Sequence, residues 1–181
     1  KNAILTPHPK EFDRLFGNSE STEERLIKQR ASSKKLACYI ILKGAHTSIS
    51  TPEGCVYMNN TGNSGMAKGG SGDVLTGLIS GLLSQGYSPL DASLIGVWIH
   101  GLAGDFAKQK KNEITMTAMD LIDDAELVLT GLKAEWKDKK DKGIDTLNKA
   151  HKAITEKIKD IRAYMMGKKQ EKQGYGTVPV I

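Results

Sequence analysis

The chain has 181 residues, of which 39% are hydrophobic and 26% charged, which is typical of one globular domain or of a domain with an appendage. No apolar run has the length of a membrane-spanning helix, and residues 1–5 lack the pattern of a secretory signal. The net charge is +5, but residues 1–132 hold 13 basic and 14 acidic side chains, whereas residues 133–181 hold 13 and 7. Because the basic excess is confined to one end, it does not indicate nucleic-acid binding. We expect a cytoplasmic protein that binds neither membrane nor nucleic acid.

Strand-like and helix-like segments alternate along the first 130 residues. Short apolar or β-favouring runs predict strands at residues 3–6, 37–42, 47–51 and 55–58. Apolar residues at helical spacing predict helices at residues 11–16, 21–37, 74–83 and 89–104, and a last short helix through 120–122 that Thr117 caps. This alternation predicts an α/β layer fold with a mainly parallel sheet.

The two cysteines, Cys38 and Cys55, both lie in strand-like stretches. We interpret them as small buried residues in a reducing compartment, and a disulfide or metal pair is the alternative.

The C-terminal third has a different pattern. Its apolar stripe steps by three or four residues through Leu147, His151, Ile154, Ile158, Ile161 and Met165. The stripe predicts an amphipathic helix that ends near Gly167, before a loose tail. We interpret it as a helix that docks on a neighbouring surface, with a basic membrane or nucleic-acid surface and a poorly ordered extension as alternatives. The predicted division is a domain at residues 1–130 and a basic helical extension at residues 131–181.

The most informative segment is residues 63–77, in which a glycine-rich loop leads into an apolar helix. The first turn of a helix has unpaired N–H groups at the positive end of its dipole, so this arrangement suits a phosphate. Asp73 follows the glycines, where a carboxylate can take a proton from a hydroxyl that attacks a phosphoryl group. The alternative is that Asp73 only caps the helix. The loop matches neither a Walker A motif nor a dinucleotide-binding GxGxxG.

Several segments together resemble one known family, the ADP- or ATP-dependent NAD(P)H-hydrate dehydratases, a ribokinase-like branch of the carbohydrate-kinase superfamily. The matching segments are residues 6–9 (TPHP), 42–47 (LKGAHT), 63–77, 100–105 (HGLAGD) and 116–122, in the family's order over about residues 1–123. The resemblance implies a ribokinase-like fold that is N-terminally truncated, so that this chain is the C-terminal portion of the domain.

The resemblance also implies an activity. Members of this family are lyases that repair hydrated NADH or NADPH: ADP or ATP, with Mg²⁺, phosphorylates the ring hydroxyl, which then leaves as phosphate. The implied partners are the hydrated nicotinamide nucleotide and an adenine nucleotide, and the full-length protein is expected to be a homo-oligomer. No side chain of the chain is assigned to a metal.

Individual residues take roles by the same resemblance. Asp73 is the expected catalytic base and contacts the hydrate, as does His8. The expected anion hole for the phosphoryl group consists of Gly70, Ser71 and Gly72. The expected nucleotide-lining residues are Lys43, Gly44, Ala45, His46, Thr47 and Gly72.

Simpler interpretations remain open for some of these residues. His8 can be a turn residue between two prolines, Lys43 can be a solvated strand end, and the imidazoles of His46 and His100 are interpreted as structural. The chain also departs from the family at Lys10 and Lys68, where the family usually has a glycine and a small hydroxyl residue. Two other functions also remain open: a ribokinase-like kinase of a small alcohol, and an inactive fragment whose C-terminal helix binds a protein partner.

Overall fold

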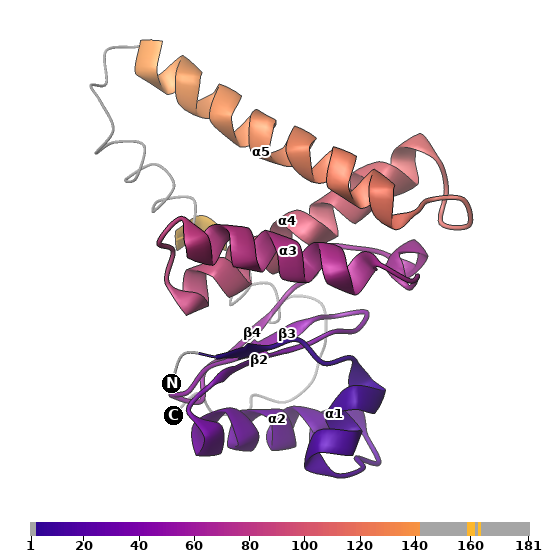
Figure 1. The fold of residues 1–181 in the computed structure, drawn as a ribbon, viewed down its shortest axis with the longest axis vertical. Coiled ribbons are helices and arrows are strands. Elements are labelled where there is room, and N and C mark those ends of the chain that lie inside the picture. Colours follow the sequence, from indigo (N-terminus) through magenta and orange to yellow (C-terminus); the bar gives the residue numbers. More distant parts are fainter. Residues whose placement is uncertain (1–2, 142–158, 162, 164–181) are drawn as a thin grey trace.

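A computed structural model describes residues 3–141, 159–161 and 163. In this part of the chain a four-stranded sheet lies between two helical layers (Figure 1). Helices α1 (Pro9–Phe16) and α2 (Thr22–Leu36) cover one face of the sheet, and α3 (Ser71–Ser84) and α4 (Pro89–Lys110) cover the other. Helix α5 (Ala118–Asp141) lies on the outer side of α4.

The sheet is mixed, so the expectation of a mainly parallel sheet is wrong for the described strands. Its order is β1 (Ile4–Leu5), β2 (Tyr39–Leu42), β3 (Ser48–Ser50) and β4 (Val56–Met58). Only β1 and β2 pair in parallel, and the two other pairings are antiparallel. The connections explain this, because a parallel pair needs a long crossover, which α1 and α2 supply, whereas the short links after β2 and β3 permit only hairpins.

The predicted helices exist, but α1, α3 and α4 extend beyond their predicted bounds. Helix α3 begins at Ser71, within the glycine-rich loop, and α4 continues to Lys110. The short last helix expected at residues 120–122 belongs to α5, which runs without a break to Asp141. Helix α5 therefore crosses residue 130, and the predicted division at that residue stays a prediction.

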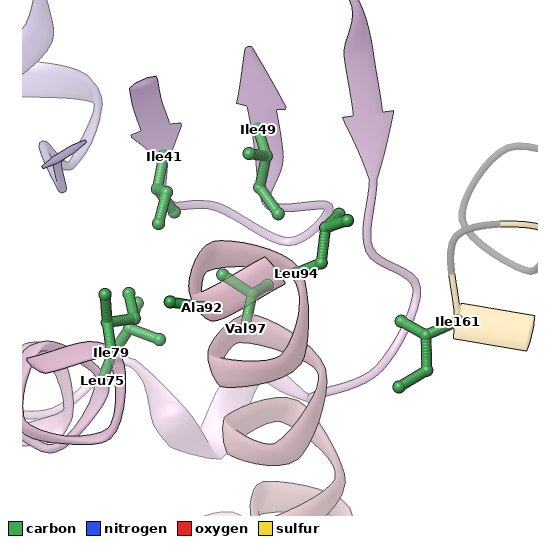
Figure 2. Close-up of a cluster of buried hydrophobic side chains, with 8 residues drawn as sticks. All are labelled: Ile41, Ile49, Leu75, Ile79, Ala92, Leu94, Val97 and Ile161. Atoms are coloured by element: carbon green, nitrogen blue, oxygen red, sulfur yellow. The ribbon is translucent and has the colours of Figure 1, made fainter. Parts of the chain in front are cut away.

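A core of aliphatic side chains joins the sheet to the upper helical layer. Figure 2 shows Ile41 and Ile49 of β2 and β3 directed toward Leu75 and Ile79 of α3, and α4 contributes Ala92, Leu94 and Val97. Each fully buried aliphatic side chain of this size contributes about 1.5–3 kcal/mol to folding. This core fixes α3, and with it the glycine-rich loop, above the carboxyl end of β2.

Ile161 also packs on this core and is only 4% exposed (Figure 2). Of the apolar stripe predicted in the C-terminal third, it alone lies within the described residues, and there it docks on the domain as expected. The other five members of the stripe, and the predicted helix end at Gly167, lie outside the described residues.

The two cysteines are both free, but they differ in burial. Cys38 is buried before β2, as expected, whereas Cys55 is exposed in the turn before β4, so the expectation of burial is wrong for Cys55. Across the described residues, no helix has both the length and the apolar character needed to cross a membrane.

Candidate active site

The glycine-rich loop ends in a helix start without a side-chain cap. Gly70 is the N-cap of α3, with φ of +88°, a backbone conformation that favours glycine, and it supplies no side-chain hydrogen bond. The amides of Asp73 and Val74 donate to the Gly70 carbonyl, both at 3.1 Å. The Gly72 amide donates to none of the described residues, which leaves it available to an anion at the positive end of the helix dipole.

The other members of the predicted anion hole differ in availability. The amide of Ser71 donates to the Lys68 carbonyl at 3.3 Å, which is a long hydrogen bond. The amide of Gly70 has no backbone acceptor among the described residues. The amides of Gly70 and Gly72 therefore have no acceptor among the described residues, and the amide of Ser71 makes one long hydrogen bond.

The carboxylate of Asp73 lies in the first turn of α3 and is exposed. It makes no hydrogen bond or ion pair with the described residues. Because Gly70 is the N-cap, the alternative that Asp73 caps the helix is wrong. The dipole stabilises a negative charge at this position, and the carboxylate remains free to accept a proton from a ligand.

Lys43, at the end of β2, reaches across to the start of α3. A Cβ atom built on Gly72 would lie 3.1 Å from Lys43 Nζ, so the ammonium lies against the backbone of Gly72. The lysine side chain is 28% exposed. The side chain is thus partly solvated, and its ammonium lies close to Gly72 at the start of α3.

The rest of the predicted nucleotide-lining segment forms a turn. Gly44, Ala45 and His46 are exposed, and Thr47 Oγ1 donates to the Gly44 carbonyl at 3.3 Å. Among the described contacts, only Lys43 joins this segment to the glycine-rich loop.

His8 caps helix α1 in a reciprocal capping box. Its Nδ1 accepts from the Glu11 amide at 3.2 Å, and the carboxylate of Glu11 accepts from the His8 amide at 2.7 Å. The Lys43 amide donates to the Pro7 carbonyl at 3.0 Å, which extends the parallel pairing and places His8 beside Lys43. His8 thus has a structural role in the turn, and its half-exposed side chain lies at the same carboxyl end of the sheet as Lys43.

Helix α4 supports the glycine-rich loop through its segment at residues 100–105. His100 Nε2 is 2.9 Å from the Ser71 carbonyl, and Asp105 accepts from the Gly62 amide at 2.9 Å and from Asn63 Nδ2 at 3.1 Å. Burial lowers the pKa of His100, the Ser71 carbonyl opposes this shift, and Lys43 lowers the pKa further. A neutral imidazole therefore donates to Ser71.

This support was only partly visible in the sequence. The interpretation of His100 as a hydrogen-bonded structural histidine is confirmed, but its partner in the anion hole was missed. Residues five apart on a helix do not share a face, so the spacing of His100 and Asp105 gives no local sequence signal for this contact.

The two departures from the family pattern are accommodated. Lys10 is exposed in the first turn of α1, so it does not crowd the site. Lys68 Nζ donates to the carbonyls of Ile114 and Met116, at 2.5 and 2.6 Å. Its ammonium is thus directed at the loop before α5 and holds that loop against the glycine-rich segment.

A protein-built metal cage is absent from the described residues, in which no group of three or more His, Cys, Asp and Glu side chains is placed to hold an ion.

Comparison with known proteins identifies the group to which the site belongs. The family model of the NAD(P)H-hydrate dehydratases matches residues 1–127. This chain belongs to that family. The bifunctional NAD(P)H-hydrate repair enzyme of Moorella thermoacetica is 45% identical to it over 134 residues, which are 73% of this chain and 25% of that enzyme. The resemblance found in the sequence is confirmed.

Solved structures agree with this assignment. The ADP/ATP-dependent NAD(P)H-hydrate dehydratase of Bacillus subtilis, co-crystallised with ATP and Mg²⁺, matches with a TM-score of 0.68 and 37% identity, over 71% of this chain and 47% of that one. A ribokinase-like superfamily protein of Enterococcus faecalis matches with a TM-score of 0.56 and 30% identity, over 70% and 44%. The ribokinase-like fold is thus confirmed, and the chain spans a quarter to a half of these relatives.

Proposed function

We propose that the protein that carries this chain removes water from hydrated NADH or NADPH, with ADP or ATP as co-substrate, and so restores the reduced cofactor. Membership of the NAD(P)H-hydrate dehydratase family supports the reaction. The ADP/ATP dependence of the Bacillus subtilis relative supports the choice of co-substrate.

Proton transfer and phosphoryl transfer are coupled in the proposed reaction. The carboxylate of Asp73 takes the proton of the ring hydroxyl, and the hydroxyl oxygen attacks the terminal phosphorus of the nucleotide. AMP leaves when ADP is used, and ADP leaves when ATP is used. The phosphorylated oxygen then leaves as inorganic phosphate together with a proton from the neighbouring ring carbon, which restores the double bond.

One observation carries this proposal. The exposed carboxylate of Asp73, which has no partner among the described residues, shares the first turn of α3 with the open amide of Gly72, beside which Lys43 lies. A phosphoryl group on that amide would be within the reach of a base and beside a positive charge. Preorganised donors of this kind stabilise the charge that develops on a transferring phosphoryl group.

The remaining site residues take supporting roles in the proposal. Gly70 and Ser71 complete the anion hole, the turn of residues 44–47 lines the nucleotide, and His8 contacts the hydrate. Mg²⁺, held by the nucleotide phosphates, would neutralise their negative charge.

A cytoplasmic location and a homo-oligomeric full-length protein belong to the same proposal. The alternative of an inactive module, whose C-terminal helix binds a partner, receives no support from Ile161, because this residue packs on the domain's own core.

An activity assay with an Asp73→Asn variant tests the proposal. With the upstream part of the domain supplied, hydrated NADH should regain the absorbance of NADH only when ADP or ATP is present. The variant should lose about a hundredfold or more of this rate, because a general base contributes roughly 10²–10⁴-fold. Its ADP affinity, measured by calorimetry, should survive.

A matched control is Asp123→Asn, an exposed aspartate of α5. This variant should keep full turnover. Unchanged turnover in Asp73→Asn would overturn the role of Asp73, and phosphate transfer to a small alcohol, without recovery of NADH, would favour the kinase alternative.

A further inference from the structure

Glu11, a side chain of α1 to which the sequence analysis assigned no role, lies between two residues of the proposed site. Its Oε2 accepts from the His8 amide at 2.7 Å and lies 3.9 Å from Lys43 Nζ, and its Oε1 lies 3.4 Å from His8 Nε2. The start of α1, the end of β2 and the start of α3 meet at one side of the molecule, on the right in Figure 1.

The ammonium of Lys43 therefore has two neighbours of different kinds. On one side is the carboxylate of Glu11, and on the other is the first turn of α3 at Gly72. Among the described residues, Glu11 is the one carboxylate that forms an ion pair with Lys43. A phosphate on the Gly72 amide would compete with this carboxylate for the same ammonium, because both are anions and Lys43 is a single point charge.

We propose that Glu11 is the resting counter-ion of Lys43, which the lysine exchanges for a nucleotide phosphate when the nucleotide binds. The exchange rests on the proposed function, because it needs a phosphate at the start of α3. Glu11 is a positioning residue that acts through Lys43. When no nucleotide is bound, the negative charge of Glu11 holds the ammonium of Lys43 beside the start of α3. The same charge weakens nucleotide binding and speeds the release of the product nucleotide.

The surroundings of Glu11 keep its carboxyl ionised. The hydrogen bond from the His8 amide is the largest cause that lowers the pKa of Glu11, and desolvation opposes it. Lys43, directly after β2, lowers the pKa of Glu11 further, and so do His8 at the N-cap of α1 and Arg14 within α1. The resting pair is thus an ion pair at neutral pH.

Glu11→Gln separates this role from helix capping. Glutamine preserves the capping box but removes the charge. ADP affinity, measured by calorimetry, should rise roughly two- to fivefold, which is the range expected for an exposed ion pair. In a Lys43→Met background the same substitution should change ADP affinity by less than this range, because the competition no longer exists.

Glu24→Gln is a matched control. Glu24 also closes a helix start, since it accepts from the Glu20 amide at 2.6 Å, and it pairs with Lys28 at 3.5 Å, but on α2. Its ADP affinity should equal that of the wild type. Unchanged or weaker ADP binding by Glu11→Gln, or an equal gain in the control, would overturn the exchange.

A measurement without nucleotide tests the resting pair itself. Carbon-13 NMR of the side-chain carboxyl should show that Lys43→Met raises the pKa of Glu11. An unchanged pKa would overturn the ion pair, even if the wild type binds ADP. If the pKa of Glu11 rises but the wild type binds no ADP, both the exchange and the proposed function are overturned. If the wild type binds ADP and Glu11→Gln binds it with the same affinity, the exchange alone is overturned.

Discussion

Two helices of this domain begin in opposite ways. Helix α2 begins at a serine whose hydroxyl accepts from the Glu24 amide at 3.0 Å, so the side chain of Ser21 satisfies a free donor of the first turn. Helix α3 begins at Gly70, which has no side chain to offer and leaves the Gly72 amide open. We interpret the start of α2 as one that its cap stabilises, and the start of α3 as the proposed anion site.

The difference has an energetic meaning. A serine cap contributes about 1 kcal/mol relative to alanine. Helix α3 lacks this contribution, and its loop is instead held by His100 and Asp105 of α4 and by its own Lys68, which bonds to the segment before α5. We infer that the ligand, rather than a cap, completes the start of α3.

The largest effect on nucleotide affinity is expected at Gly70. A Cβ at this position would lie 3.0 Å from Ala118 Cβ and would occupy a backbone with φ of +88°. Gly70→Ala should therefore shift the loop, at a cost of about 1–2 kcal/mol, and reduce ADP affinity roughly 5–30-fold in calorimetry.

Gly86→Ala is the control for the backbone strain alone. Gly86 has φ of +86° after α3, and a Cβ there would contact nothing within 4 Å. This variant should lose a similar amount of stability but keep its ADP affinity. Equal losses of affinity in both variants would mean that the start of α3 is no more specialised than any other turn.

A smaller effect is expected at His100, which supports α3 without contacting the ligand. His100→Leu removes the donor to the Ser71 carbonyl and should weaken ADP binding roughly 2–10-fold, the range of one hydrogen bond. His100→Gln can keep the bond and should bind ADP as the wild type does. Ser93→Ala, at a buried serine of α4 that donates to the Pro89 carbonyl at 2.7 Å, should leave ADP affinity unchanged.

The same residue predicts a dependence of stability on pH. Because burial lowers the pKa of His100 in the folded state, the unfolded chain takes up this proton first, as the pH falls below its ordinary pKa of 6.5. The neutral imidazole of His100 therefore contributes its full share to the free energy of unfolding above pH 6.5, and this share is lost as the pH falls toward the pKa of the folded state. Urea titrations should show a flatter pH dependence for His100→Gln, and an unchanged slope would contradict the prediction.

The sequence predicted the start of α3 better than its surroundings. The glycines of residues 69–72 and the apolar run after Asp73 were sufficient to indicate an anion site, because both signals are local. The location of Lys43 beside Gly72 was not predictable in the same way, since it depends on how the end of β2 packs against α3, and the two residues are 29 positions apart.

Strand direction was missed for a related reason. Alternating strands and helices favour a parallel sheet, but only a short turn joins β3 to β4, and this local connection determined their antiparallel pairing. Glu11 was missed because its sequence signal, three residues after His8, is that of a capping box. Its nearness to Lys43 is a product of the tertiary fold.

The smallest effect on nucleotide affinity is expected at the capped helix starts. Ser21→Ala in α2 and Ser88→Ala in α4 each remove a hydroxyl that accepts from a first-turn amide, at 3.0 and 3.1 Å. Each should lower the free energy of unfolding by about 1 kcal/mol, measured by urea denaturation, and leave ADP affinity unchanged. The free energy of unfolding should fall without a change in ADP affinity, because these caps satisfy amides at helix starts to which we assign no ligand. A loss of ADP affinity in either variant would mean that general stability, and not the open start of α3, controls nucleotide binding.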